Sequence, residues 1–303
     1  MRTRLLAAFG AIYLLWGSTY LAVSVGLRSF PPLALMGVRC LAGGVILLAW
    51  GLLRGQSFPP LKLLWAGVGC GLLFFVGCHG VLAMAQQHVP SSTAAIILAT
   101  IPFWIAISRF LLPGERRPPV STILALGAGF IGVGIIAWPA PSSNIHQAAP
   151  GWIVALLAAS ISWALGTNLS QRRKGNTSAI TLAGVELLAG GLVLATLCVS
   201  THELDDFRME AISLQSLGAL AYLTVAGTVI AFAAYIWLLE QVDPTLIATY
   251  TFVNPVIAVV LGWVFLNEQL TTRMFAGAPL IIGAVCAAWM IDRKRAAPHH
   301  QGI

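Results

Sequence analysis

Long runs of apolar residues dominate the chain, and they predict helices that cross a membrane. Each run approaches or exceeds the roughly 20 residues that a helix needs to cover the hydrocarbon core. None alternates apolar and polar positions as a half-buried strand does. Ten runs can be drawn: Leu5–Gly26, Leu33–Leu53, Leu63–Ala85, Ser91–Leu112, Val120–Trp138, Gly151–Gln171, Ser178–Val199, Leu217–Leu239, Thr245–Leu266 and Met274–Ile291. The pattern predicts an all-α integral membrane protein with ten transmembrane helices.

The second half of the chain repeats landmarks of the first. Trp16 stands at the same spacing from Trp163 as Arg39 does from Glu186. The repeated landmarks are Trp16 and Trp163, Arg39 and Glu186, Gly43-Gly44 and Gly190-Gly191, and Pro102 and Pro255, each proline preceding a glutamate. Because each half holds five predicted spans, the second half must enter the membrane from the opposite face. Inverted repeats of this kind are typical of transporters with alternating access.

These landmarks also divide the chain. We expect a first five-helix repeat at residues 1–139, a connecting loop at 140–150, a second five-helix repeat at 151–292 and a basic cytoplasmic tail at 293–303. The two repeats should surround a central cavity.

Composition and charge agree with a membrane protein. Hydrophobic residues make up 58% of the chain and charged residues 9%, whereas a soluble domain carries roughly 25% charged residues. The net charge of +7 then concerns orientation in the membrane, and we expect no nucleic-acid partner. Basic residues gather on one side of the membrane, at Arg2, Arg4, Arg54, Lys62, Arg116, Arg117, Arg172 to Lys174 and Arg293 to Arg295. By the positive-inside rule, both termini are predicted to be cytoplasmic.

Three stretches resemble a known family. They are Leu15-Trp16-Gly17-Ser18, the run from Ala94 to Glu115, and the run from Ile247 to Glu268, the last two each with a central proline and a closing glutamate. In these features the chain resembles the EamA-domain proteins of the drug/metabolite transporter superfamily over nearly its whole length. The resemblance implies a ten-helix basket in a bacterial plasma membrane that exports amino acids or related small metabolites.

Three ionisable residues lie well inside predicted spans, where charged groups mark function by default. Arg39 is a candidate for attracting a substrate carboxylate, and Glu186 for binding a substrate amine or a coupling proton. An ion pair or hydrogen bonds that hold the two repeats together explain the same residues equally well. His79 suits proton-linked switching, or it packs as a neutral ring bonded to a carbonyl. It has no second ligand at helical spacing, so we expect no metal site.

Aromatic and small polar residues complete the candidate substrate pathway. The aromatic candidates are Trp16, Tyr20, Trp104, Trp163 and Tyr250, and the polar candidates are Ser18, Thr19, Asn168 and Asn254. Aromatic walls with a few polar groups describe small-molecule pockets, although core packing and interhelical hydrogen bonds account for the same residue types. Pro102 and Pro255 each remove a backbone hydrogen bond in mid-span and are predicted to kink their helices as hinges.

The sequence therefore predicts a secondary transporter that exports small amphipathic metabolites, above all amino acids, by alternating access. Proton-coupled efflux of drugs or cations is the alternative, followed by exchange of sugar phosphates or nucleotide sugars. No phosphate-binding loop or hydrolase motif occurs, so we expect neither an enzyme nor a cofactor. The expected partners are a small-molecule substrate and the lipid bilayer, with the protein acting as a monomer.

Overall fold

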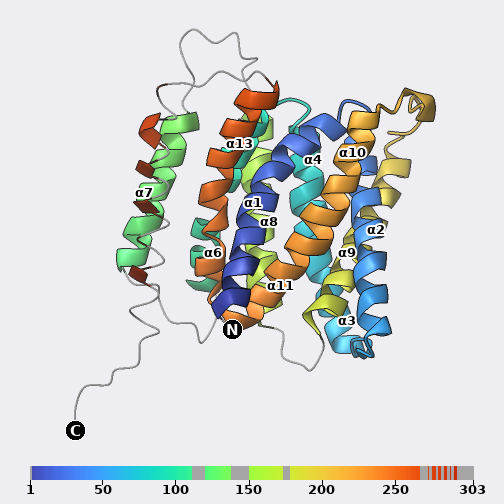
Figure 1. Ribbon diagram of the computed structural model, residues 1–303, viewed down its shortest axis with the longest axis horizontal. Helices are drawn as coiled ribbons and strands as arrows, with labels where there is room; N and C mark the ends of the chain where they lie inside the picture. The colour runs from blue at the N-terminus through green and yellow to red at the C-terminus, as the bar shows by residue number, and fades with distance from the viewer. Residues whose placement is uncertain are drawn as a thin grey trace.

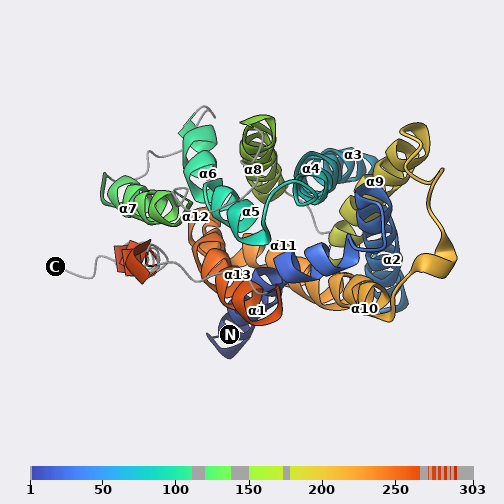
Figure 2. The same cartoon turned by 90° about the horizontal axis from the view of Figure 1, so that it is seen from above.

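The computed structural model describes residues 2–110, 120–137, 150–172 and 178–266, together with scattered helical residues between 272 and 291. The regular elements of these residues are all helices, most of which run along a common direction (Figure 1). Seen from above, α7 lies toward one end of the bundle and α2 with α9 toward the other, with α1, α8 and α11 between them (Figure 2). The arrangement is an all-helical bundle.

The helices of the first half follow the predicted apolar runs. Their bounds are α1 Arg2–Gly26, α2 Pro32–Leu53, α3 Leu61–Gly71, the π-helix η1 Leu72–Gly80, α4 Val81–Ala85, α5 Ser91–Leu98, α6 Ile101–Phe110 and α7 Val120–Ala137. Three of them, α3, η1 and α4, form one continuous rod.

The second half is organised in a similar way. Its helices are α8 Pro150–Gln171, α9 Ala179–Ser200, the short 3-10 helix η2 Met209–Ala211, α10 Leu214–Tyr222, the π-helix η3 Leu223–Ile230, α11 Ala231–Gln241, α12 Pro244–Ile247 and α13 Tyr250–Leu266. Here α10, η3 and α11 form the continuous rod.

Six helical rods are long and apolar enough to cross a membrane. In the described residues they are Thr3–Gly26, Pro32–Leu53, Leu61–Ala85, Gly151–Gln171, Ala179–Ser200 and Leu214–Gln241. Shorter apolar helices cover Ser91–Ile105, Ile123–Gly132 and Tyr250–Leu266. The number of ten spans stays a prediction, and the predicted basic tail at 293–303 lies outside the described residues.

The prolines at 102 and 255 occupy different positions in their helices. The fourth predicted span is interrupted at Ala99 and Thr100, which puts Pro102 in the first turn of α6. A proline there loses nothing, because the first N–H groups of a helix have no partner within it. Pro255 lies inside α13, while the ninth span is interrupted earlier, at Ala248 and Thr249. The role of both prolines as hinges stays a prediction.

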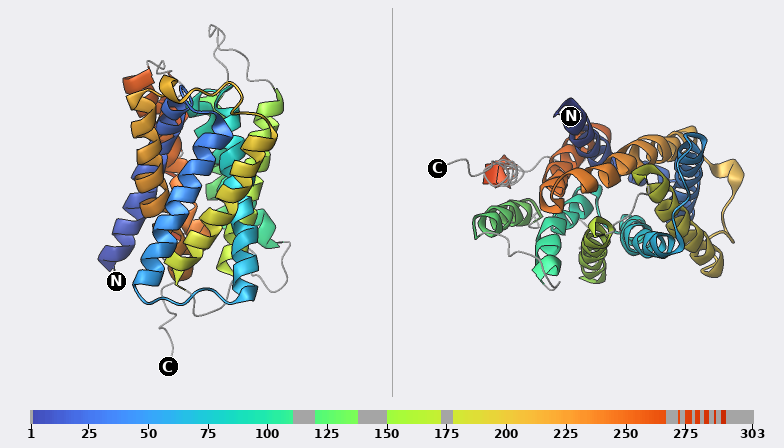
Figure 3. Two further views of the ribbon diagram at one scale, coloured as in Figure 1. Left: turned by 90° about the vertical axis from the view of Figure 1, so that its right-hand side faces the viewer. Right: turned by 90° about the horizontal axis from the view of Figure 1, so that it is seen from below.

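Helix α2 packs on α9 more extensively than any other described pair of elements (Figure 3). A Cβ atom added at Gly44 would lie 2.9 Å from the backbone nitrogen of Leu188, and one added at Gly191 would lie 2.9 Å from that of Leu41. Both pairs of like residues are 147 positions apart, from 44 to 191 and from 41 to 188. Each helix therefore presents the same glycine to the same leucine of the other, which allows close packing of the two backbones.

The segment after α9 closes over the turn between α1 and α2. The carboxylate of Glu203 accepts a hydrogen bond of 3.0 Å from the backbone nitrogen of Leu33, in the first turn of α2. The rings of Phe30 and Phe207 lie 6.0 Å apart. A carboxylate is favourable at a helix N-terminus, and Pro31, the residue before α2, provides no side-chain cap. The second half thus supplies the cap that the first half lacks.

Candidate functional site

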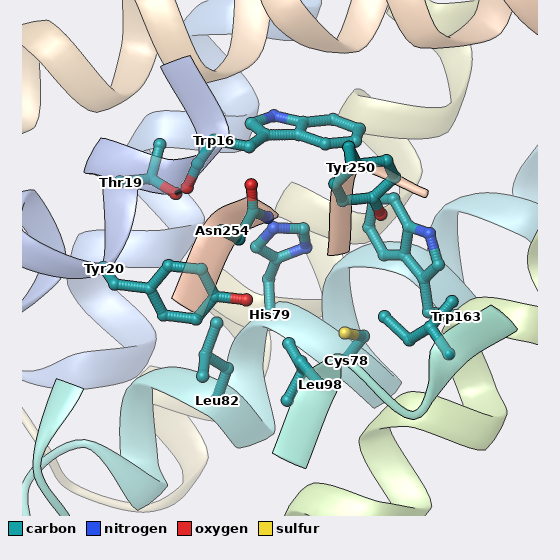
Figure 4. Close-up of a pocket in the computed structure, with 11 residues that line it drawn as sticks. Trp16, Thr19, Tyr20, Cys78, His79, Leu82, Leu98, Trp163, Tyr250 and Asn254 are labelled. Atoms are coloured by element: carbon teal, nitrogen blue, oxygen red, sulfur yellow. Dashed lines mark hydrogen bonds between the residues drawn. The ribbon is translucent and has the colours of Figure 1, made fainter. Parts of the chain in front are cut away.

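A cavity lies among the helices, and about 350 Å³ of space in and at the mouth of it is not filled by protein atoms. It is lined by Trp16, Thr19 and Tyr20 of α1, Cys78 and His79 of η1, Leu82 of α4, Leu98 of α5, Ile101 of α6, Trp163 of α8, and Tyr250 and Asn254 of α13 (Figure 4). Both halves of the chain therefore contribute to it.

Aromatic rings form one wall of the cavity. The ring of Trp16 meets that of Trp163 edge to face at 5.5 Å and that of Tyr250 at 4.7 Å, measured between centroids. Tyr235, which is buried, lies 5.1 Å from Trp16. The indole nitrogen of Trp16 donates a hydrogen bond of 2.8 Å to the carbonyl of Gly227 in η3. The ring that begins the repeat pattern is thus fixed to a π-helix of the other half.

His79 enters the cavity from the π-helix η1. Its Nδ1 lies 3.0 Å from the carbonyl oxygen of Phe74, five residues earlier. A carbonyl only accepts hydrogen bonds, so Nδ1 carries the hydrogen, and the neutral ring then has Nε2 as an acceptor. The ring stacks on Phe75 at 5.6 Å and meets Trp163 at 5.1 Å.

The polar groups of the cavity wall are few and carry no formal charge when His79 is neutral. The hydroxyl of Thr19 donates to the carbonyl of Trp16 at 2.7 Å. Asn254 is 1% exposed, and its carboxamide oxygen has no hydrogen-bond partner. Among the described residues that line the cavity there is no aspartate, glutamate, lysine or arginine. The wall is therefore aromatic, with isolated hydrogen-bonding groups.

The structure brings together seven of the twelve residues that the sequence predicts for the substrate pathway. These are Trp16, Thr19, Tyr20, His79, Trp163, Tyr250 and Asn254. The other five, Ser18, Trp104, Asn168, Arg39 and Glu186, are not part of this wall.

Three of the remaining five make polar contacts with helices around the cavity. The Ser18 hydroxyl lies 2.6 Å from the Tyr222 hydroxyl, which links α1 to α10. Trp104 donates to the Thr100 hydroxyl at 3.1 Å, and Asn168 donates to the Ser108 hydroxyl at 2.7 Å. These contacts are the interhelical and local bonds that the sequence left open as an alternative.

Arg39 is 1% exposed and makes polar contacts with helices other than α9. Its Nε donates to the Thr228 hydroxyl at 2.6 Å, and its Nη1 lies 3.6 Å from the sulfur of Met36. Glu186 is also buried, and its backbone carbonyl packs directly on Gly71. Arg39 thus links the two halves by a hydrogen bond to Thr228, which is the structural alternative considered for it.

Four lining residues carry no signal of function in the sequence. Cys78, Leu82, Leu98 and Ile101 are apolar or weakly polar residues within apolar runs. Helical spacing from His79 points to Leu82, because residues three apart share a helix face. Nothing comparable points to Leu98 or Ile101, since they join the cavity only through packing between helices.

The model of the EamA-like transporter family matches the chain twice, over residues 4–138 and 150–290. The chain belongs to this family. The Escherichia coli K12 protein named uncharacterized inner membrane transporter YedA is 35% identical over 298 residues, covering 94% of this chain and 92% of its own. Protein PecM of Dickeya dadantii is 27% identical over 296 residues, covering 94% of each chain.

The fold also occurs in a solved crystal structure. That structure has a TM-score of 0.74 and 23% sequence identity, and the match covers 96% of this chain and 99% of the other. This EamA-family protein is therefore a multi-pass membrane transporter. Neither YedA nor PecM has a substrate in its name.

Proposed function

We propose that this transporter exports small amphipathic metabolites, amino acids among them, by alternating access. The observation that carries the proposal is the cavity wall, in which both halves place aromatic rings around a few uncharged polar groups. Such a wall suits a molecule with an apolar body and one or two polar groups, because rings cover the body and isolated donors or acceptors orient the rest.

The same wall argues against the other substrate classes. Phosphorylated sugars and nucleotide sugars carry negative charge and call for basic groups at the binding site. Arg39 donates to the Thr228 hydroxyl, and neither Arg39 nor Glu186 is among the residues that line the cavity. A lipophilic cation favours an acidic counter-charge, and no described lining residue supplies one. A molecule with an apolar body and one or two hydrogen-bonding groups fits best.

Two inverted five-helix repeats, at 1–139 and 151–292, form the proposed framework for alternating access. The reciprocal packing of Gly44 on Leu188 and of Gly191 on Leu41 supports it. So does the meeting of Trp16 with its predicted counterpart Trp163 at the cavity. The proposal includes ten spans and both termini in the cytoplasm of a bacterial cell.

We propose that two hydroxyl contacts close the cavity toward the end of the bundle that holds the N-terminus. One turn before Trp16 on α1, the Tyr13 hydroxyl lies 2.6 Å from the Thr249 hydroxyl. The hydroxyls of Thr167 and Tyr235 lie 2.5 Å apart in the same region. We take this as the inward-closed state, so the opposite state requires these aromatic and hydroxyl contacts to separate.

Uptake into liposomes that contain the purified protein tests the proposal. The probes are labelled amino acids and the lipophilic cation tetraphenylphosphonium, each with and without an imposed pH gradient. Trp16→Ala should abolish amino-acid uptake, whereas Trp152→Ala should not, since Trp152 stacks on His88 outside the cavity at 4.6 Å. If only the cation moves, the cation-efflux alternative replaces the proposal; if neither class moves, export of small amphipathic metabolites is refuted.

A further inference from the structure

We propose that the cavity recognises the primary ammonium group of its ligand, with Asn254 and His79 accepting its hydrogens. The inference rests on the proposed function, because it names the end of the transported molecule that this same cavity holds. It assigns the amine to the cavity wall rather than to Glu186.

The first observation is the unpartnered oxygen of Asn254. The side chain is 1% exposed, lines the cavity, and leaves its carboxamide oxygen without a hydrogen bond in the structure. Leaving an acceptor buried in this way without a hydrogen bond costs free energy. A ligand that brings an N–H to this oxygen removes that cost.

The second observation is the orientation of His79. Because Nδ1 donates to the Phe74 carbonyl at 3.0 Å, Nε2 is the acceptor of the neutral ring. Figure 4 shows the imidazole next to Asn254 in the centre of the cavity, with Trp16 and Tyr250 on one side. The cavity wall therefore presents two hydrogen-bond acceptors, which a ligand group with several N–H hydrogens can satisfy together.

The third observation is the ring system around these acceptors. Trp16 packs against Tyr250 at 4.7 Å and against Trp163 at 5.5 Å, and all three line the cavity. The faces of aromatic rings attract cations and repel carboxylates. Acceptors and ring faces together favour a positively charged donor, and a primary ammonium has both the charge and three N–H groups.

The opposite wall suits the apolar part of such a ligand. Leu82, Leu98 and Cys78 lie on the side of the cavity away from Trp16 (Figure 4). A quaternary ammonium of the same shape has the charge but no N–H, so it satisfies neither Asn254 nor His79. The cavity should therefore rank a primary amine above its trimethylated form.

Equilibrium binding to the purified full-length protein in detergent tests this order without transport. Labelled 2-phenylethylamine is the probe, and its competitors are unlabelled 2-phenylethylamine, trimethyl(2-phenylethyl)ammonium and 3-phenylpropanoate. We expect the trimethylated competitor to be roughly a hundredfold weaker than the amine, because it loses two hydrogen bonds at about tenfold each. Equal competition by all three, stronger competition by the carboxylate, or no saturable binding of the amine overturns the inference.

Variants of α13 locate the effect. Asn254→Leu should weaken 2-phenylethylamine roughly tenfold and leave the affinity for the trimethylated form nearly unchanged. The matched control is Thr251→Val, one turn away on the same helix. The Thr251 hydroxyl donates a hydrogen bond of 2.7 Å to the carbonyl of Ala248, three residues earlier in the chain. An equal loss for both ligands, or for both variants, contradicts the inference. Amine binding with no transport of any probe would instead contradict the proposed function alone.

Discussion

The two π-helices, η1 and η3, lie in the middle of long helical rods in opposite halves of the chain. They share the same backbone irregularity, but their side chains make different contacts. In both, a side chain reaches a carbonyl five residues earlier. His79 Nδ1 lies 3.0 Å from the Phe74 oxygen in η1, and the Thr228 hydroxyl donates to Leu223 at 2.8 Å in η3. Such short π segments are frequent at functional sites.

Both π-helices also accept a donor from the other half. In η1, the carbonyl of Leu73 accepts from the Ser162 hydroxyl of α8 at 2.8 Å. In η3, the carbonyl of Gly227 accepts from the Trp16 indole of α1 at 2.8 Å. Helices α1 and α8, which the repeat makes counterparts, are thus each tied to a π-helix of the opposite half.

The two π-helices differ in the second contact made by the side chain that bonds to the carbonyl five residues earlier. The ring of His79 lines the cavity, while the Thr228 hydroxyl also accepts the Nε hydrogen of the buried Arg39 at 2.6 Å. One π-helix presents a side chain to the cavity, and the other holds a buried cation. The two halves therefore share a backbone arrangement but use it for different side-chain contacts. Substitutions in η1 and in η3 should accordingly differ in their effects on stability and on ligand binding.

The largest effect is expected from the glycines of the two π-helix regions. A Cβ at Gly71, just before η1, would collide with the backbone carbonyl of Glu186, which cannot move alone. A Cβ at Gly227 would meet the methyl group of Thr19 at 2.8 Å. Overpacking costs roughly 1–3 kcal/mol and more against a backbone. Gly71→Ala should yield no folded protein by size-exclusion chromatography, while Gly227→Ala folds with a lowered melting temperature. If both variants fold with the same melting temperature, the two π-helix regions do not differ in how tightly their glycines are packed.

Thr228→Val comes next, because it leaves the buried guanidinium of Arg39 without its Nε acceptor. Breaking the partner of a buried charge costs roughly 3 kcal/mol. We expect a clear drop in thermal stability in detergent, which Thr228→Ser should restore by keeping the hydroxyl. Binding of 2-phenylethylamine per folded molecule should stay unchanged. If Thr228→Val is as stable as the parent, η3 is not an anchor for Arg39.

The sequence predicts much of this framework because apolar length and repeat spacing are local or regular features. The helices follow the predicted runs in the described residues, and family membership is confirmed by the match to both segments. The repeat singles out Trp16 and Trp163, and their rings meet at the cavity.

The rest depends on packing that no single segment encodes. The runs 72–80 and 223–230 read as ordinary apolar helix, because the wider turn of a π-helix has no composition of its own. The partner of Arg39 is a threonine 189 residues away, which spacing within the repeat did not reveal. Leu98 of α5 and Ile101 of α6 line the cavity through packing between helices, which their own segments do not encode.

His79→Phe is expected to have a smaller effect on stability than Thr228→Val. The phenyl ring can keep the stacking on Phe75, and the variant loses one neutral hydrogen bond to Phe74, worth about 1 kcal/mol. His79→Phe should affect ligand binding more than stability, because 2-phenylethylamine should bind roughly tenfold more weakly. Melting temperature and binding, measured on the same preparation, separate the two. A stability loss as large as that of Thr228→Val, with binding intact, would make η1 a structural anchor like η3.

The smallest effect is expected from Ser162→Ala, which removes the donor from α8 to the Leu73 carbonyl. Hydrogen bonds between helices in membranes average about 0.6 kcal/mol, because the unfolded chain also finds partners in the bilayer. Ser200→Ala is the control, since that exposed hydroxyl bonds within its own helix, to Leu197. A melting temperature lowered by Ser162→Ala and not by Ser200→Ala would show that η1 is held from α8 as η3 is held from α1. If the melting curves are indistinguishable, the hydrogen bond between Ser162 and Leu73 contributes nothing to stability. The bond from Trp16 to η3 then has no stabilising equivalent at η1.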